Sequence, residues 1–104
     1  MSRCKRHEPV PEDVRRAADV LERRYAVSIL YASHTGCTRF TEFRRALGRI
    51  PPATLAQRLA ELESAGVLRR EVRDTRPPHV EYVLTPAGRR LEGLLEALAL
   101  WARA

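Results

Sequence analysis

Apolar residues recur at helical spacing in four stretches of the first two thirds of the chain. The spacing predicts helices over residues 12–22, 25–33, 41–47 and 52–65. In the fourth stretch Leu55, Leu59 and Leu62 follow at intervals of four and three, which places a single apolar stripe on the helix. Pro52 suits its first turn, because the missing N–H would have no partner within the helix there.

The period of the apolar pattern changes after residue 66. Residues 67–72 mix valine and leucine with charged residues, and residues 80–84 alternate around Val80, Tyr82 and Leu84, so two antiparallel strands are predicted. The loop between them, residues 73–79, contains two prolines that keep it out of the ladder. Residues 85–86, a threonine and a proline, then open a last helix that runs to the C-terminus.

The predicted order of elements is helix, helix, short helix, tight turn, helix, hairpin, helix. Residues 48–51 join the third helix to the fourth and form a short turn with a glycine, as a helix-turn-helix requires. We therefore predict a mainly α fold with a small β-hairpin: a winged helix-turn-helix of about five helices plus a two-stranded wing. Residues 1–11 are predicted to be a basic N-terminal arm, and residues 12–104 the domain, with terminal helices that dimerise.

Charge adds a preference for anionic partners. The 104 residues carry 19 Lys and Arg against 13 Asp and Glu, a net charge of +6, in a chain that is long enough for one domain only. Residues 37–79 hold nine basic and five acidic residues, whereas residues 80–104 hold three of each. Because phosphate binding needs basic side chains on the face that meets DNA, the middle segment is where a nucleic acid would bind.

The fourth helix, residues 52–65, is predicted to enter the major groove of double-stranded DNA. Gln57 matches adenine and Arg58 matches guanine, so both can carry sequence information, and the loop 73–79 could reach a flanking groove or the backbone. The alternative is a solvated helix face and an ordinary polar loop. The predicted DNA-binding residues are Arg39, Arg44, Arg45, Pro52, Thr54, Gln57, Arg58, Arg73 and Arg76.

The last helix has more leucines than one core-facing stripe needs. A second copy of the chain would bury them, which predicts a homodimer on a near-palindromic operator, with two recognition helices roughly 34 Å apart. The alternative is that this helix packs only on its own domain. The predicted interface residues are Val14, Leu21, Leu94, Leu98 and Trp101.

These elements, taken together, resemble the HxlR-type winged helix-turn-helix regulators, relatives of the MarR group. The matching pieces are residues 39–43, Ile50, Pro52, residues 54–55, residues 57–59, Leu62, residues 66–67 and residues 77–88 (PPHVEYVLTPAG). The resemblance spans about Val14 to Leu91. It implies a homodimeric DNA-binding transcriptional regulator of a bacterium or archaeon, often a repressor.

Several members of that family respond to oxidants or electrophiles through a cysteine at the start of the first helix. This sequence departs from the pattern, because the family's Cys-Pro pair would fall near Pro11, and residues 23–25 replace its Gly-Lys-Trp. Cys4 has basic neighbours, which favour a reactive thiolate. Cys4 and Cys37 are therefore candidate redox residues, with incidental thiols as the alternative.

Other function classes have little support in the sequence. The histidines are scattered, and neither a nucleophile–base pair nor a phosphate-binding glycine loop stands out, so we expect no metal, no cofactor and no enzyme. No apolar run is long enough to cross a bilayer, so we expect a cytoplasmic protein without membrane contact. No pattern indicates an effector. Two rival functions stay open: a nonspecific architectural nucleic-acid-binding domain, and a winged-helix protein-interaction adaptor.

Overall fold

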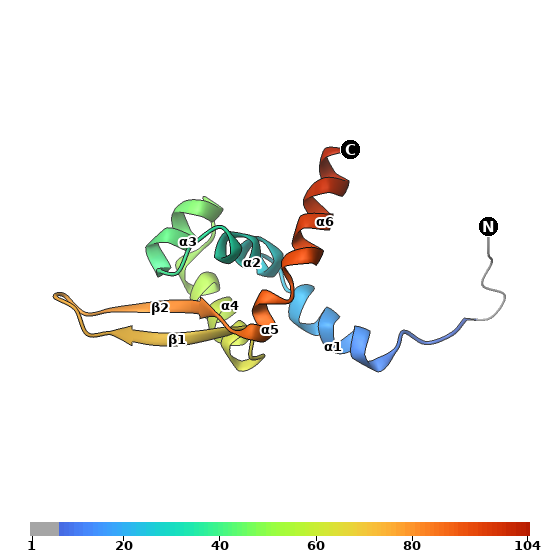
Figure 1. The fold of residues 1–104 in the computed structure, drawn as a ribbon, viewed down its shortest axis with the longest axis horizontal. Helices are drawn as coiled ribbons and strands as arrows, with labels where there is room; N and C mark the ends of the chain where they lie inside the picture. Colours follow the sequence, from blue (N-terminus) through green and yellow to red (C-terminus); the bar gives the residue numbers. More distant parts are fainter. Residues whose placement is uncertain (1–6) are drawn as a thin grey trace.

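The computed structural model describes residues 7–104 and confirms the winged helix-turn-helix (Figure 1). A body of helices carries a long two-stranded hairpin on one side, and the first and last helices extend away from it on the other. The elements, in chain order, are α1 (Glu12–Leu21), α2 (Ala26–His34), α3 (Phe40–Leu47), α4 (Pro52–Ser64), β1 (Leu68–Arg73), β2 (His79–Leu84), α5 (Pro86–Arg89) and α6 (Glu92–Arg103).

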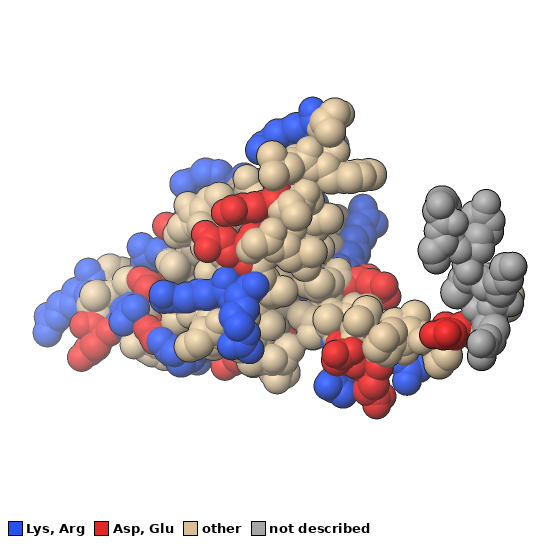
Figure 2. All heavy atoms as spheres, turned by 45° about the vertical axis from the view of Figure 1, so that its right-hand side comes forward, with Lys and Arg blue, Asp and Glu red and all other residues tan. Residues whose placement is uncertain are grey.

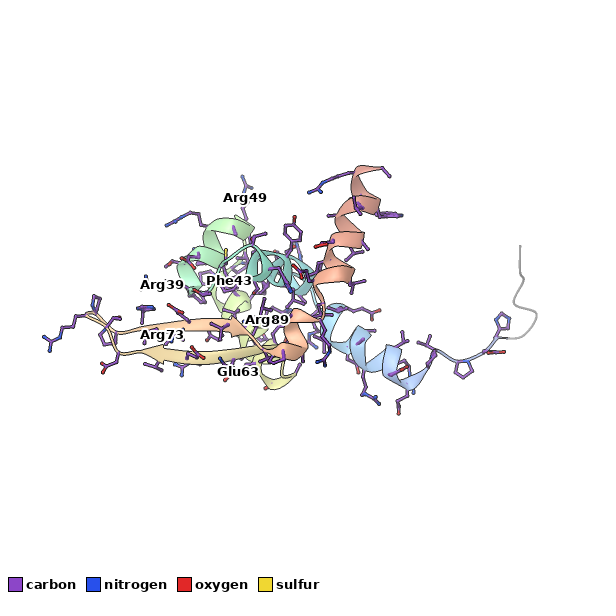
Figure 3. The ribbon with its side chains drawn as sticks, viewed as in Figure 1. Arg39, Phe43, Arg49, Glu63, Arg73 and Arg89 are labelled. Atoms are coloured by element: carbon purple, nitrogen blue, oxygen red, sulfur yellow. The ribbon has the colours of Figure 1, made fainter. Side chains whose placement is uncertain are left out.

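The core lies where α2, α3 and α4 meet the root of the hairpin. Its largest fully buried side chains are Phe43, Ile29, Leu30, Leu55, Leu59, Leu62 and Leu68. Figure 3 shows Phe43 within this body, while Arg49 points away from it. The three leucines of α4 are all buried, which confirms the apolar stripe and fixes the face that α4 turns outward.

The turn between α3 and α4 has the geometry of a helix-turn-helix. Gly48 ends α3 with φ of +74°, a left-handed conformation that glycine adopts without a Cβ clash. Ile50 is buried beneath the turn, and Pro52 occupies the first position of α4. The two helices are thereby held at a fixed angle by only four connecting residues.

Each strand of the hairpin extends one residue further toward the tip than the sequence predicted, and the loop between them is correspondingly shorter. Its antiparallel register runs from Leu68 opposite Leu84 to Arg73 opposite His79, so Arg73 and His79 close the ladder instead of belonging to the loop. Near its middle the wing is tied to the body, because the amide of Tyr82 donates a 2.7 Å hydrogen bond to the carbonyl of Thr38.

The last helix is divided, which corrects the single helix predicted from residue 85 to the C-terminus. α5 is pressed against the root of β1, where a Cβ on Gly88 would lie only 2.2 Å from the carbonyl oxygen of Val67. The hydroxyl of Thr85 bonds the same carbonyl and accepts the amide of Gly88. The chain then turns at Arg90, so α6 leaves in a new direction.

α1 and α6 contribute little to the core. α1 has no buried residue, and α6 buries only Leu95. None of the helices within residues 7–104 is long and apolar enough to cross a membrane.

Candidate nucleic-acid interface

Over residues 52–60, the outward face of α4 consists of small side chains and one amide. Ala53, Ala56, Gln57 and Ala60 are exposed, as is Pro52, and Thr54 is half-buried. Small side chains allow another macromolecule to approach the helix backbone closely, and the methyl groups of alanine and threonine can contact the thymine methyl group in the major groove. Of the predicted base-reading residues, Gln57 is therefore the most accessible.

Arg58 has a different environment from the one its sequence position suggested. Its side chain is only 15% exposed, its Nε donates a 2.9 Å hydrogen bond to the carbonyl of Arg24, and its Nη1 lies 3.3 Å from the carboxylate of Glu61. A base contact would have to break these interactions. The geometry thus favours a role in attaching α4 to the connection between α1 and α2 over the predicted guanine contact.

The remaining predicted arginines fall into two groups, those that form an ion pair with a carboxylate and those that do not. Arg39, Arg44, Arg45 and Arg76 are exposed and form no ion pair with any of residues 7–104. Their charges are therefore available to phosphates. Figure 2 shows basic side chains along the hairpin and over the middle of the visible face, with acidic side chains among them.

Two further arginines in the same state were not among the predicted contacts. Arg49 lies in the helix-turn-helix turn, and Arg70 lies on β1; both are exposed and unpaired among the described residues. The position of Arg49 in the turn between the two predicted helices could have identified it as a candidate phosphate contact from the sequence alone. For Arg70 the signal was weaker, because Arg69 and Arg70 point to opposite faces of the strand and only the structure shows which one is paired.

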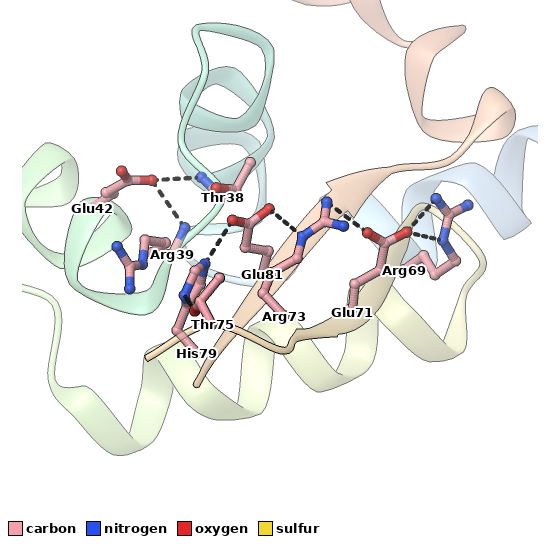
Figure 4. A network of polar contacts seen from close by, with 9 residues as sticks. All are labelled: Thr38, Arg39, Glu42, Arg69, Glu71, Arg73, Thr75, His79 and Glu81. Atoms are coloured by element: carbon pink, nitrogen blue, oxygen red, sulfur yellow. Dashed lines mark hydrogen bonds and ion pairs between the residues drawn. The ribbon is translucent and has the colours of Figure 1, made fainter. Parts of the chain in front are cut away.

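Arg73 belongs to a chain of polar contacts along the wing (Figure 4). Its guanidinium lies 2.8 Å from the carboxylate of Glu71 and 3.1 Å from that of Glu81. Glu71 also binds Arg69 at 2.6 Å, and Glu81 also binds His79 at 2.8 Å. The hydrogen bonds from His79 and Arg73 lower the pKa of Glu81. Arg73 is therefore shared between two carboxylates, which favours a role in ordering the wing.

The start of α3 is fixed by a second carboxylate. Glu42 accepts the backbone amides of Thr38 at 2.9 Å and Arg39 at 3.0 Å. These two hydrogen bonds lower the pKa of Glu42. The arrangement caps the N-terminus of α3, which begins directly after the exposed Arg39.

The two candidate redox cysteines have different outcomes. Cys4 lies outside the described residues. Cys37 is half-buried, and its burial and the nearby charge of Glu42 both raise the pKa of the thiol, which opposes formation of a reactive thiolate. The structure adds no support for redox chemistry at Cys37. Within residues 7–104, no group of three or more His, Cys, Asp or Glu side chains is arranged to hold a metal ion.

Apolar side chains remain exposed on the two helices that extend from the body. Val14 on α1 is 52% exposed, Leu94 and Leu98 on α6 are 42% and 41% exposed, and Trp101 is 81% exposed. Leu21, the fifth predicted interface residue, is half-buried and packs on the core. Leu98 also borders an apolar groove formed by α2, α3 and α6.

Comparison with known proteins agrees with this architecture. The model of the HxlR-like helix-turn-helix family matches residues 20–104. The chain belongs to this family. Similar proteins include the HTH-type transcriptional regulator YtfH of Escherichia coli, with 44% identity over 75% of this chain, and the HTH-type transcriptional regulator YvaP of Bacillus subtilis, with 36% identity over 84% of this chain.

The likeness extends to solved structures. The redox regulator HypR in its reduced form superposes with a TM-score of 0.80 at 36% identity, covering 88% of this chain and 91% of HypR. The match to YtfH covers 62% of the length of that relative, and the match to YvaP covers 81%. Residues 20–104, which the family model matches, include the helix-turn-helix and the wing.

Proposed function

We propose that this protein is a sequence-specific DNA-binding transcriptional regulator, a repressor that binds a near-palindromic operator as a homodimer. In this proposal α4 enters the major groove, and Thr54 and Gln57 contact base edges near its N-terminus. The wing lies on the flanking groove or backbone through Arg76. We place this activity in the cytoplasm, where bacterial and archaeal DNA is found.

The observation that carries the proposal is the outward face of α4. It combines close backbone access at Ala53 and Ala56 with one exposed amide, Gln57, that has both a donor and an acceptor. An adaptor that binds apolar protein surfaces would need large apolar side chains on this face instead. Phosphate contacts beside it come from four arginines that form no ion pair within residues 7–104: Arg39 directly before α3, Arg44 and Arg45 on α3, and Arg49 in the following turn.

The exposed apolar side chains of α1 and α6 support the homodimer. Trp101 is 81% exposed and Leu100 is 68% exposed, which is unfavourable for a helix that stays alone in water. A second copy related by a two-fold axis would cover the same residues on both chains. Such a dimer presents two copies of α4, which is why the operator is proposed to be near-palindromic.

The experiment is selection of bound duplexes from a random-sequence pool at near-physiological salt, with light scattering on the same sample. We expect a dimer that enriches a palindrome with half-sites about one helical turn apart. Trp101→Asp, which adds a charge on α6 without changing α4, should give a monomer and lose the palindromic enrichment. Tight binding of every duplex with no enriched sequence would contradict the proposal and favour a nonspecific nucleic-acid-binding domain.

Whether the protein represses is tested separately, with the enriched operator placed in a reporter promoter. We expect reporter expression to fall when the protein is produced, and to be unchanged when the operator is scrambled. Increased expression from the intact operator would make the protein an activator and leave the DNA-binding proposal in place.

A further inference from the structure

Glu61 on α4 receives three side chains at once. Its Oε2 accepts hydrogen bonds from Arg23 at 2.8 Å and from Gln57 at 3.3 Å, and its Oε1 lies 3.3 Å from Nη1 of Arg58. Gln57 precedes Glu61 by one helical turn, so the two side chains lie on the same side of the helix. One carboxylate thus connects the exposed amide of α4 to two arginines.

The arginine partners attach this carboxylate to another part of the fold. Arg23 lies in the connection between α1 and α2, and Arg58 donates to the backbone of its neighbour, Arg24. Asp19 of α1 lines the same small hollow as Arg23, Arg58 and Glu61. The cluster therefore joins α4 to the end of α1, a helix that has no buried residue of its own.

The chemistry of the carboxylate determines how Gln57 faces outward. An ionised carboxylate only accepts hydrogen bonds, so it binds the NH2 end of the Gln57 amide and excludes its oxygen. Oε1 of Gln57 and its second N–H are then left for another partner, which is the donor and acceptor pair that adenine requires. Without Glu61 the amide can rotate by half a turn and present the reversed pattern.

We infer that Glu61 is a positioning residue for sequence readout: it fixes the amide of Gln57 in the orientation that reads a base, and Arg23 and Arg58 hold Glu61 in place. The two arginines also offset the negative charge of Glu61, which would otherwise repel DNA phosphates. This inference rests on the proposed function. It adds that base preference depends on Arg23, a residue outside the helix-turn-helix.

The test measures relative affinities for the enriched operator and for all of its single-base-pair variants. Gln57→Ala identifies the base pair that Gln57 reads, where the wild-type preference of about tenfold should fall below about threefold. Glu61→Ala should flatten the preference at that same base pair and leave the other positions unchanged. Glu63→Ala is the matched control, because Glu63 is exposed on the same helix and forms no ion pair with residues 7–104.

Conservative and double variants separate positioning from a general structural effect. Glu61→Gln keeps the shape and one acceptor but can itself rotate, so its profile at the identified base pair should lie between those of wild type and Gln57→Ala. This variant decides the question if Glu61→Ala does not fold. The double variant of Gln57 and Glu61 should be no flatter than Gln57→Ala alone, and Arg23→Ala should flatten the same position less than Glu61→Ala.

Several outcomes would overturn the inference. Glu61→Ala and Glu61→Gln profiles equal to wild type, or affinity lost equally on every duplex, would show that Glu61 does not position a reader. A Gln57→Ala profile without change at any base pair would do the same. In each case enrichment of an operator by the wild type would keep the proposed sequence-specific regulator, and an unchanged Gln57→Ala profile would remove only the base contact assigned to Gln57. Wild type without any sequence preference would defeat the proposed function itself.

Discussion

The helix α4 and the wing both carry arginines within the proposed DNA surface, but these arginines differ in what they bind. On α4 the single arginine, Arg58, is 15% exposed and fixed to the protein, so that helix presents alanines and Gln57. On the wing Arg73 is 45% exposed and shared by two carboxylates, while Arg70 and Arg76 form no ion pair with any residue from 7 to 104. In the proposed complex with DNA, α4 would then supply shape and a hydrogen-bond pattern, and the wing would supply charge.

The largest expected effect concerns how much the packing of each region contributes to the free energy of unfolding. Leu59 of α4 is fully buried, so Leu59→Ala should lower the free energy of unfolding by about 2–5 kcal/mol. Val72 of the wing is 64% exposed, and Val72→Ala should change it by no more than about 0.5 kcal/mol. Chemical denaturation of both variants measures the difference. Equal losses would show that the wing, too, depends on a packed core.

A second pair of variants compares the two engaged arginines. Arg58→Ala removes a nearly buried charged donor from the carbonyl of Arg24 and should lower the free energy of unfolding by about 1–3 kcal/mol. Arg73→Ala breaks ion pairs that water screens, so its effect on the same quantity should be clearly smaller. If Arg58→Ala leaves stability unchanged and flattens preference at a base pair other than the one that Gln57 reads, the direct guanine contact predicted from the sequence would hold after all.

The third prediction concerns free charge on the wing. Arg76→Ala should weaken binding to the operator and to a scrambled duplex by the same factor, because a phosphate contact carries no sequence information. The slope of log affinity against log salt should become shallower by about 1. Arg15→Ala on α1 removes the same charge far from the wing and should leave the slope unchanged. A loss confined to the operator would instead assign Arg76 a base contact.

The smallest expected effect is the dependence of stability on acid. The pKa of Glu81 is lowered in the folded protein, so its contribution is present above the ordinary carboxyl pKa of about 4.3 and is lost as pH falls through the lowered pKa. Glu81→Gln should therefore reduce the loss of stability between neutral pH and pH 3. Denaturation at several pH values measures this, with Glu63→Gln as the control. Equal acid sensitivity in wild type and Glu81→Gln would contradict the role of the wing contacts.

Periodicity and turn residues were sufficient to predict the main elements. Helices α1 to α4 begin and end within about two residues of the predicted bounds, because apolar spacing and the caps at Gly48 and Pro52 are local signals. The division between α5 and α6 was missed, since it depends on the contact of Gly88 with Val67, which is distant in sequence.

The predicted surface was less complete than the fold. Periodicity assigned Arg58 to the flank of α4, but it could not show that the chain around Arg24 covers that flank. The partners of Arg73 depend on the register of the hairpin, which places Glu71 opposite Glu81. Glu61 was assigned no role from the sequence, although its spacing from Gln57 and Arg58 matches that of side chains that meet on one side of a helix.

The close approach of Gly88 to Val67 has a mechanical consequence. The hydrogen bond of Thr85 and the close approach of Gly88 attach α5 to Val67 at the root of β1, and the bend at Arg90 sets the angle at which α6 departs. In a homodimer formed through α6, the angle of this bend would determine the distance between the two copies of α4. The distance between the two half-sites of the operator would then be determined by a turn that does not contact DNA.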